Sequence, residues 1–115
     1  EILIRNNEFT PSLSNDIPLT RRLRKVWEEK LGKEAVSTRE AVMGGEDFSR
    51  YAREGVPSCM LFLGTVPKNK YEASLMNKNA SLPSLHSEYY HPEMPISLET
   101  GINATVSAVL DLLKN

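Results

Sequence analysis

The stretch from 15 to 32, NDIPLTRRLRKVWEEKLG, contains the start, the apolar face and the end of an amphipathic helix. Asn15 or Asp16 can accept hydrogen bonds from the free N–H groups of a first turn, which Pro18 also suits. Gly32 is a typical helix terminator. Apolar residues recur at helical spacing on one side, and we interpret them as a core stripe: Leu19, Leu23, Val26, Trp27 and Leu31.

Predicted strands and helices alternate on both sides of this helix. Residues 1–9 predict an extended segment, residues 35–43 a strand that ends in a glycine turn, and residues 58–64 a buried strand. Residues 46–54 predict a short helix that ends at a glycine. Helices and strands in this order favour an α/β fold, in which a sheet is flanked by helices.

The last third of the chain contains a polar stretch followed by the most strongly periodic segment. Residues 65–82 lose apolar periodicity and predict a long surface loop. Residues 97–113 predict a long helix, because their apolar residues recur at helical spacing. That apolar stripe consists of Leu98, Ile102, Val106, Val109, Leu110 and Leu113.

Charge and composition exclude several classes of protein. Fourteen basic and fifteen acidic residues give a net charge of -1, so the chain lacks the basic footprint of a nucleic-acid or anionic-membrane binder. The longest apolar run, residues 59–63, is far shorter than the ~20 residues that a membrane-spanning helix needs. Cys59 is the only cysteine, so no internal disulfide can form, and we expect it to pack as a small hydrophobe.

Residues 82–93, LPSLHSEYYHPE, combine both histidines with two carboxylates and two phenols. A metal site needs imidazole nitrogen or carboxylate oxygen close to one point, and a loop can supply these ligands. The spacing of His86 and His91 matches no compact ligand signature. These residues alone therefore favour a surface or hydrogen-bonded role over metal ligation.

Residues 43–49, MGGEDFS, place a glycine pair just before a predicted helix start. Free N–H groups and the positive end of a helix dipole can hold a carboxylate or phosphate there. The alternative is that Gly44 and Gly45 only make the turn while Glu46 and Asp47 offset the dipole. Taken alone, the segment favours this second interpretation.

Taken together and in order, these segments resemble the C-terminal part of metal-dependent amidohydrolases. This family includes aminoacylases, hippurate hydrolases, auxin-conjugate hydrolases and related carboxypeptidases. The resemblance extends over the whole chain. It is carried by FTPSLSND at 9–16, MGGEDFS at 43–49, LFLG at 61–64, LHS at 85–87, and TG at 100–101.

The resemblance implies a layered α/β catalytic domain with two divalent cations, zinc or manganese, and a smaller lid domain inserted within it. Residues 1–13 would be the last strand of the lid, and residues 14–115 the C-terminal segment of the catalytic domain. The implied reaction is hydrolysis of the amide bond of N-acyl amino acids or small peptide-like substrates by a metal-bridged water. The expected partners are that small-molecule substrate and a second copy, bound as a homodimer through the lid.

The resemblance also assigns roles to individual residues. His86 matches the histidine that ligates one cation, whereas His91 has no counterpart among the ligands. Gly44, Gly45 and Glu46 map to the segment that lines the substrate cleft. The remaining ligands and the glutamate that acts as general base lie upstream in the family, so no catalytic residue is expected in this chain.

Two further expectations concern the chain as a unit. It has no initiator Met and begins inside the strand-like run at 2–4, so we expect a piece of a longer enzyme that is inactive alone. The alternative to an enzyme is a non-catalytic binding or dimerisation module on the same scaffold.

Overall fold

Helix α1 (Ile17–Leu31) begins and ends where the sequence predicts. In the computed structural model, which describes residues 2, 9–77 and 81–114, Asp16 is the N-cap, and its carboxylate accepts from the Leu19 N–H at 2.8 Å. Pro18 lies in the first turn. Gly32 follows the helix with φ 95°, a backbone region that favours glycine, and its N–H donates to the Glu28 carbonyl at 3.1 Å.

The core forms where α1 packs against α4 (Ile96–Leu112). Leu23 and Trp27 of α1 meet two alanines of α4, Ala104 and Ala108, and all four are buried. The Trp27 indole N–H donates to the Ala104 carbonyl at 2.9 Å, so its polar edge is satisfied inside the core. Leu19, Leu31, Val36 and Cys59 pack around this cluster, which confirms the packing expected for the cysteine.

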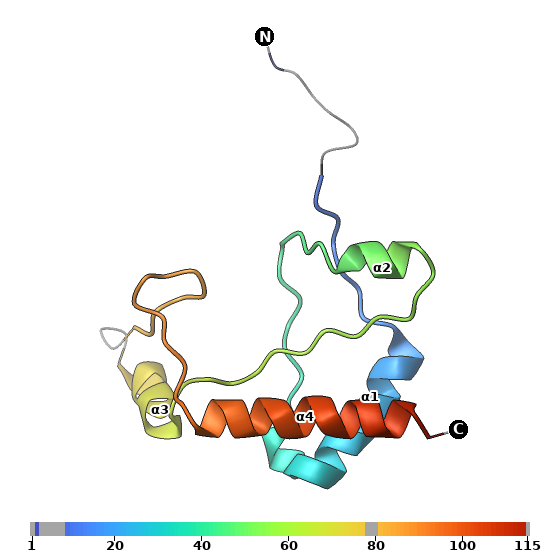
Figure 1. The fold of residues 1–115 in the computed structure, drawn as a ribbon. Helices are drawn as coiled ribbons and strands as arrows, with labels where there is room; N and C mark the ends of the chain where they lie inside the picture. The colour runs from blue at the N-terminus through green and yellow to red at the C-terminus, as the bar shows by residue number, and fades with distance from the viewer. Residues whose placement is uncertain (1, 3–8, 78–80, 115) are drawn as a thin grey trace.

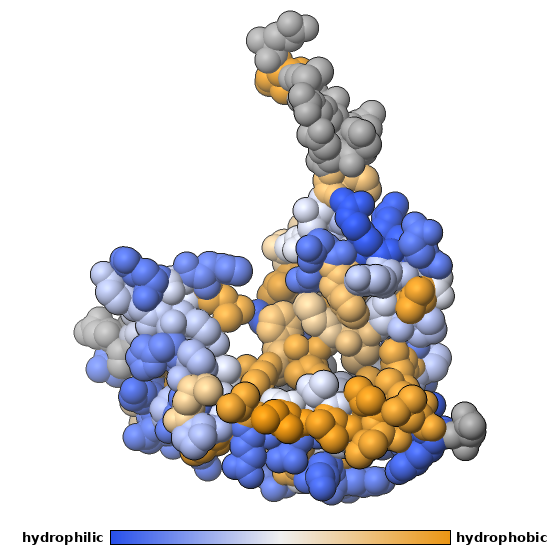
Figure 2. Space-filling view, in the orientation of Figure 1, coloured by the Kyte–Doolittle hydropathy of each residue, from blue (hydrophilic) through white to orange (hydrophobic). Residues whose placement is uncertain are grey.

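The predicted apolar stripe of α4 does not face this core. Its six residues are between 48% and 72% exposed. Figure 2 shows an apolar band along the helix. The buried residues of α4 are all small, namely Ser97, Ala104 and Ala108, and the two alanines leave room for the Trp27 ring. The bounds of this helix were predicted well, but its buried face was not.

Three shorter helices complete the fold. The 3-10 helix η1 (Lys33–Ala35) follows α1, and α2 (Ser49–Arg53) lies inside the segment predicted as the short helix. Helix α3 (Lys68–Met76) corrects the prediction of a long loop at 65–82. A Lys68–Glu72 ion pair at 3.8 Å, one helical turn apart, supports α3. No residue of α3 is buried, so it lacks the apolar stripe by which helices are recognised in sequence.

The predicted α/β class, with a sheet flanked by helices, is wrong for residues 2, 9–77 and 81–114, where all regular structure is helical. Residues 36–42 and 58–64 run as extended segments in Figure 1, but no ladder of backbone hydrogen bonds joins them. They meet instead through side chains, with the Arg39 guanidinium 4.1 Å from the centre of the Phe62 ring. Alternation of apolar residues favours an extended backbone, but a strand also requires a paired neighbour.

Side-chain and backbone groups at the start of α1 form hydrogen bonds with the backbone of the second extended segment. The Asn15 amide group donates to the Met60 carbonyl and accepts from the Met60 N–H, both at 2.9 Å. The Asp16 N–H donates to the Ser58 carbonyl at 2.8 Å. The Asn15 side chain thus takes the place that a neighbouring strand would have at Met60.

The molecule is a thin, open layer of 49 × 48 × 22 Å with a radius of gyration of 17.2 Å, whereas a compact chain of this length measures roughly 13 Å. Helix α4 forms one side of the layer, and α2 and α3 lie apart from each other (Figure 1). The lid assignment of residues 1–13 stays a prediction, as does the homodimer through the lid. Most of that segment, residues 1 and 3–8, lies outside the described residues. No helix in the described ranges is long and apolar enough to cross a membrane.

Candidate functional site

His86 lies in a turn with an unusual backbone conformation. The Ser87 N–H donates to the Ser84 carbonyl at 3.1 Å, and His86 is the third residue of this turn, with φ 69°. Glycine normally takes a positive φ at this position, since an L-residue there costs roughly 1–2 kcal/mol. Such strain is typical of functional positions. The His86 side chain is exposed and makes no hydrogen bond or ion pair with other described residues.

A second turn follows directly and fixes the loop to the rest of the molecule. The Tyr90 N–H donates to the Ser87 carbonyl at 3.0 Å. The Tyr90 hydroxyl lies 2.6 Å from the Thr65 hydroxyl, and the Glu93 N–H donates to the Thr65 carbonyl at 2.8 Å. Two hydrogen bonds to one threonine therefore hold the loop that presents His86.

A small pocket of about 180 Å³ opens between this loop and the start of α3. Its apolar lining consists of Val66, Pro67, Leu82 and Pro83, and its aromatic lining of Tyr89 and Tyr90. The polar side chains that line it are Lys70, His91 and Glu93. The two tyrosines and His91 belong to the segment selected from sequence. Lys70 and the contribution of α3 were missed, because neither residue type nor periodicity marks them.

The glycine segment leads into α2, and three of its backbone N–H groups are already occupied. The Glu46 N–H donates to the Pro11 carbonyl at 2.8 Å, and the Phe48 N–H to the Glu46 carboxylate at 3.2 Å. The Ser49 N–H donates to the Glu46 carbonyl at 3.0 Å. The half-buried Glu46 thus offsets the partial positive charge at the start of α2. This agrees with the interpretation in which the glycines make the turn and the acidic residues offset the helix dipole.

The two glycines have different surroundings. Neither has a positive φ, so the turn does not use the conformational freedom that glycine alone provides. A Cβ on Gly45 would lie 2.8 Å from the Thr10 carbonyl oxygen, whereas a Cβ on Gly44 meets nothing within 4 Å. Gly45 is therefore needed for close packing against residue 10, and Gly44 leaves open backbone at the surface.

This difference predicts a large loss of stability for one of two matched substitutions and almost none for the other. Gly45→Ala should destabilise the packing of the turn by roughly 1–3 kcal/mol, because the clashing atom belongs to the backbone and cannot move aside cheaply. Gly44→Ala should stay within about 0.5 kcal/mol of the wild type. Hydrogen exchange at the Glu46 amide, together with urea unfolding, measures both effects. Similar protection factors in the two variants would contradict the assignment.

The two predicted parts of the site lie on different parts of the molecule. Within residues 9–77 and 81–114, no hydrogen bond joins the glycine segment to the His86 loop. Figure 2 shows a notch in the surface between the part that contains α3 and the His86 loop and the part that contains α2. A ligand in contact with both predicted parts would have to span this notch.

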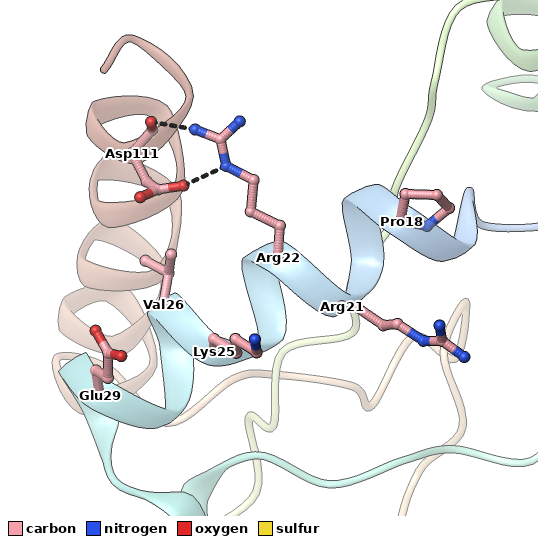
Figure 3. A pocket seen from close by; sticks show the side chains of 7 residues that line it. All are labelled: Pro18, Arg21, Arg22, Lys25, Val26, Glu29 and Asp111. Carbon is pink, nitrogen blue, oxygen red and sulfur yellow. Dashed lines mark hydrogen bonds and ion pairs between the residues drawn. The ribbon is translucent and has the colours of Figure 1, made fainter. Parts of the chain in front are cut away.

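A larger hollow of about 430 Å³ lies elsewhere, between α1 and the end of α4 (Figure 3). It contains none of the predicted site residues. Arg22 donates two hydrogen bonds to Asp111, from Nε to the carboxylate at 2.7 Å and from Nη2 to the carbonyl at 2.6 Å. Arg21 points away from Arg22, so the basic side chains do not converge on one point. We interpret this hollow as a helix junction.

The described residues contain no complete metal site. Within the described ranges, no three side chains of His, Cys, Asp or Glu gather closely enough to hold a metal ion. His86 fits the role of one ligand, since its imidazole is exposed and has no partner among the described residues. These residues thus fit a share of a metal site and do not form a complete one.

The model of the peptidase family M20/M25/M40 matches residues 2–110. The chain belongs to this family. Family M20 membership confirms the broad resemblance found in the sequence and assigns a peptidase or hydrolase type of function. Peptidases of family M20 are generally metal-dependent. No curated protein and no solved structure matches the chain.

Proposed function

We propose that this M20 chain is part of a metal-dependent amidohydrolase that cleaves the amide bond of N-acyl amino acids or small peptide-like compounds. The observation that carries the proposal is His86. It lies in the LHS motif of that subgroup and has a left-handed backbone conformation that its turn must hold in place. Family membership supports the hydrolase class, and the motifs named above support the amidohydrolase subgroup.

In this proposal His86 supplies one neutral imidazole nitrogen to a cation held jointly with ligands outside the described residues. Zinc or manganese, two ions in the proposed enzyme, supplies Lewis acidity and an activated water nucleophile at neutral pH. The turn does the positioning, because the bond between Ser84 and Ser87 closes it around His86 and the Thr65 bonds to Tyr90 and Glu93 anchor the loop that follows. An exposed imidazole that has no partner among the described residues is free to bind the ion.

Gly44, Gly45 and Glu46 are proposed to form the segment that lines the substrate cleft. Gly44 leaves room for close approach, since nothing lies within 4 Å of the place its Cβ would take. Gly45 and Glu46 hold the segment against residues 10 and 11. Their contribution is to position the exposed backbone of Gly44 at the edge of the cleft.

The experiment is hydrolysis of a panel of N-acyl amino acids by the intact natural protein, with metal content measured in the same sample. We expect turnover that a chelator abolishes and that added zinc or manganese restores. The non-catalytic alternative, a binding or dimerisation module, predicts neither turnover nor stoichiometric metal. Metal-dependent cleavage of peptides alone would keep the family but reject the N-acyl amino acid subgroup.

A further inference from the structure

The pocket beside the His86 loop has the size of a single ring. Its volume is about 180 Å³, and a cavity of roughly 150 Å³ can hold benzene. Pockets that enclose a whole drug-sized ligand measure roughly 300–1,000 Å³. This pocket can therefore take one substituent of a substrate but not an entire N-acyl amino acid.

The lining of the pocket suits an apolar, preferably aromatic group. Four aliphatic side chains and two phenol rings form most of it, while the charged groups of Lys70 and Glu93 are not ion-paired to each other in the described structure. Tyr90 is a fixed part of the wall, because its hydroxyl is bonded to Thr65. Tyr89 is 72% exposed, so its ring forms the open edge.

The pocket lies close to the proposed metal ligand in the chain itself. Tyr89 is three residues from His86, and three residues span at most roughly 11 Å. The two turns that share Ser87 join these positions without a flexible linker. The Cα of Tyr89, at the open edge of the pocket, thus lies within about 11 Å of the Cα of His86.

We propose that this pocket binds one ring-sized apolar group of the amide substrate and so determines which substrates are preferred. The inference rests on the proposed function, because the substrate must also reach a metal held by His86. The shared chemistry is an aromatic or bulky aliphatic substituent. It can come from the acyl group or from the side chain of the amino acid.

The test compares Tyr89→Ala with Tyr71→Ala in the intact natural protein. Tyr71 is a matched control, since it is an exposed tyrosine of α3 that does not line the pocket. Four substrates form the panel: N-benzoyl and N-acetyl derivatives of glycine and of phenylalanine. Loss of one aromatic contact should lower kcat/KM for ring-bearing substrates roughly 5- to 10-fold relative to N-acetylglycine. Tyr71→Ala should leave this ratio unchanged.

The possible outcomes distinguish the acyl group from the amino-acid side chain as the source of the ring. They also distinguish failure of the pocket from failure of the proposed function. A change confined to the benzoyl substrates assigns the acyl group, and one confined to the phenylalanine substrates assigns the side chain. Hydrolysis with an unchanged ratio in Tyr89→Ala would overturn the pocket and leave the proposed function standing. No hydrolysis of any substrate by the wild type would overturn the function and this inference together. As a direct readout, saturation-transfer NMR should detect benzamide on the wild type and lose most of that signal in Tyr89→Ala.

Discussion

Replacing His86 with glycine should lower activity by at least roughly 100-fold without lowering stability. Changes to groups that only orient a metal ligand cost roughly 10- to 100-fold, so loss of the ligand itself should cost more. Glycine removes the imidazole but also relieves the left-handed backbone, φ 69°, which disfavours L-residues. Metal content, kcat/KM and the urea midpoint of His86→Gly in the intact protein measure all three effects.

Two further variants make this result specific. His86→Ala should lose the same activity and metal as His86→Gly, but with a lower urea midpoint, because alanine keeps the strained backbone. His91→Ala should retain its metal, since that residue has no counterpart among the ligands. Full metal and full rate in His86→Gly, or equal metal loss in the His86 and His91 variants, would show that the ligand is misassigned.

Replacing Trp27 with alanine should destabilise the chain by roughly 3–5 kcal/mol. The ring is buried between α1 and α4, and its N–H bond to the Ala104 carbonyl is lost together with its packing. Total stability of a domain is only about 5–15 kcal/mol, so much of the population should unfold in mild denaturant. Far-UV circular dichroism follows the transition, because the variant lacks the only tryptophan.

The neighbouring residue gives the control. Val26 is half-buried on the same helix and does not belong to the buried cluster. Val26→Ala should therefore cost about 1 kcal/mol or less. Equal unfolding midpoints for the two variants would mean that the contact between α1 and α4 does not hold the fold together.

Features determined by neighbouring residues were predicted well. The start and end of α1 depend on Asp16, Pro18 and Gly32, which act within one turn of the helix ends. The bounds of α4 follow from periodicity in the same way. Its buried face does not, because the pattern selects the largest apolar residues, whereas the partner Trp27 requires alanines. Which side of an apolar helix is buried depends on a segment far away in sequence.

Non-local features were predicted least well. The two expected strands are extended but unpaired, since pairing depends on neighbours that periodicity does not reveal. In the candidate site, His86 was selected through the family motif alone. Its turn conformation and its attachment through Thr65 became visible only in three dimensions. Thr65 was predicted to start a long surface loop, and nothing in its local sequence distinguishes it.

The contact between Trp27 and Ala104 also affects the order in which the chain can fold. The two residues are 77 positions apart, so the core cannot form until all of the sequence between α1 and α4 and the first half of α4 have been synthesised. Loop-closure entropy rises slowly with length, by roughly 0.6 kcal/mol for each doubling, so this separation costs little final stability. It delays folding instead, because distant contacts must be found by diffusion. During translation, Trp27 therefore cannot form its bond to Ala104 until that part of α4 has left the ribosome.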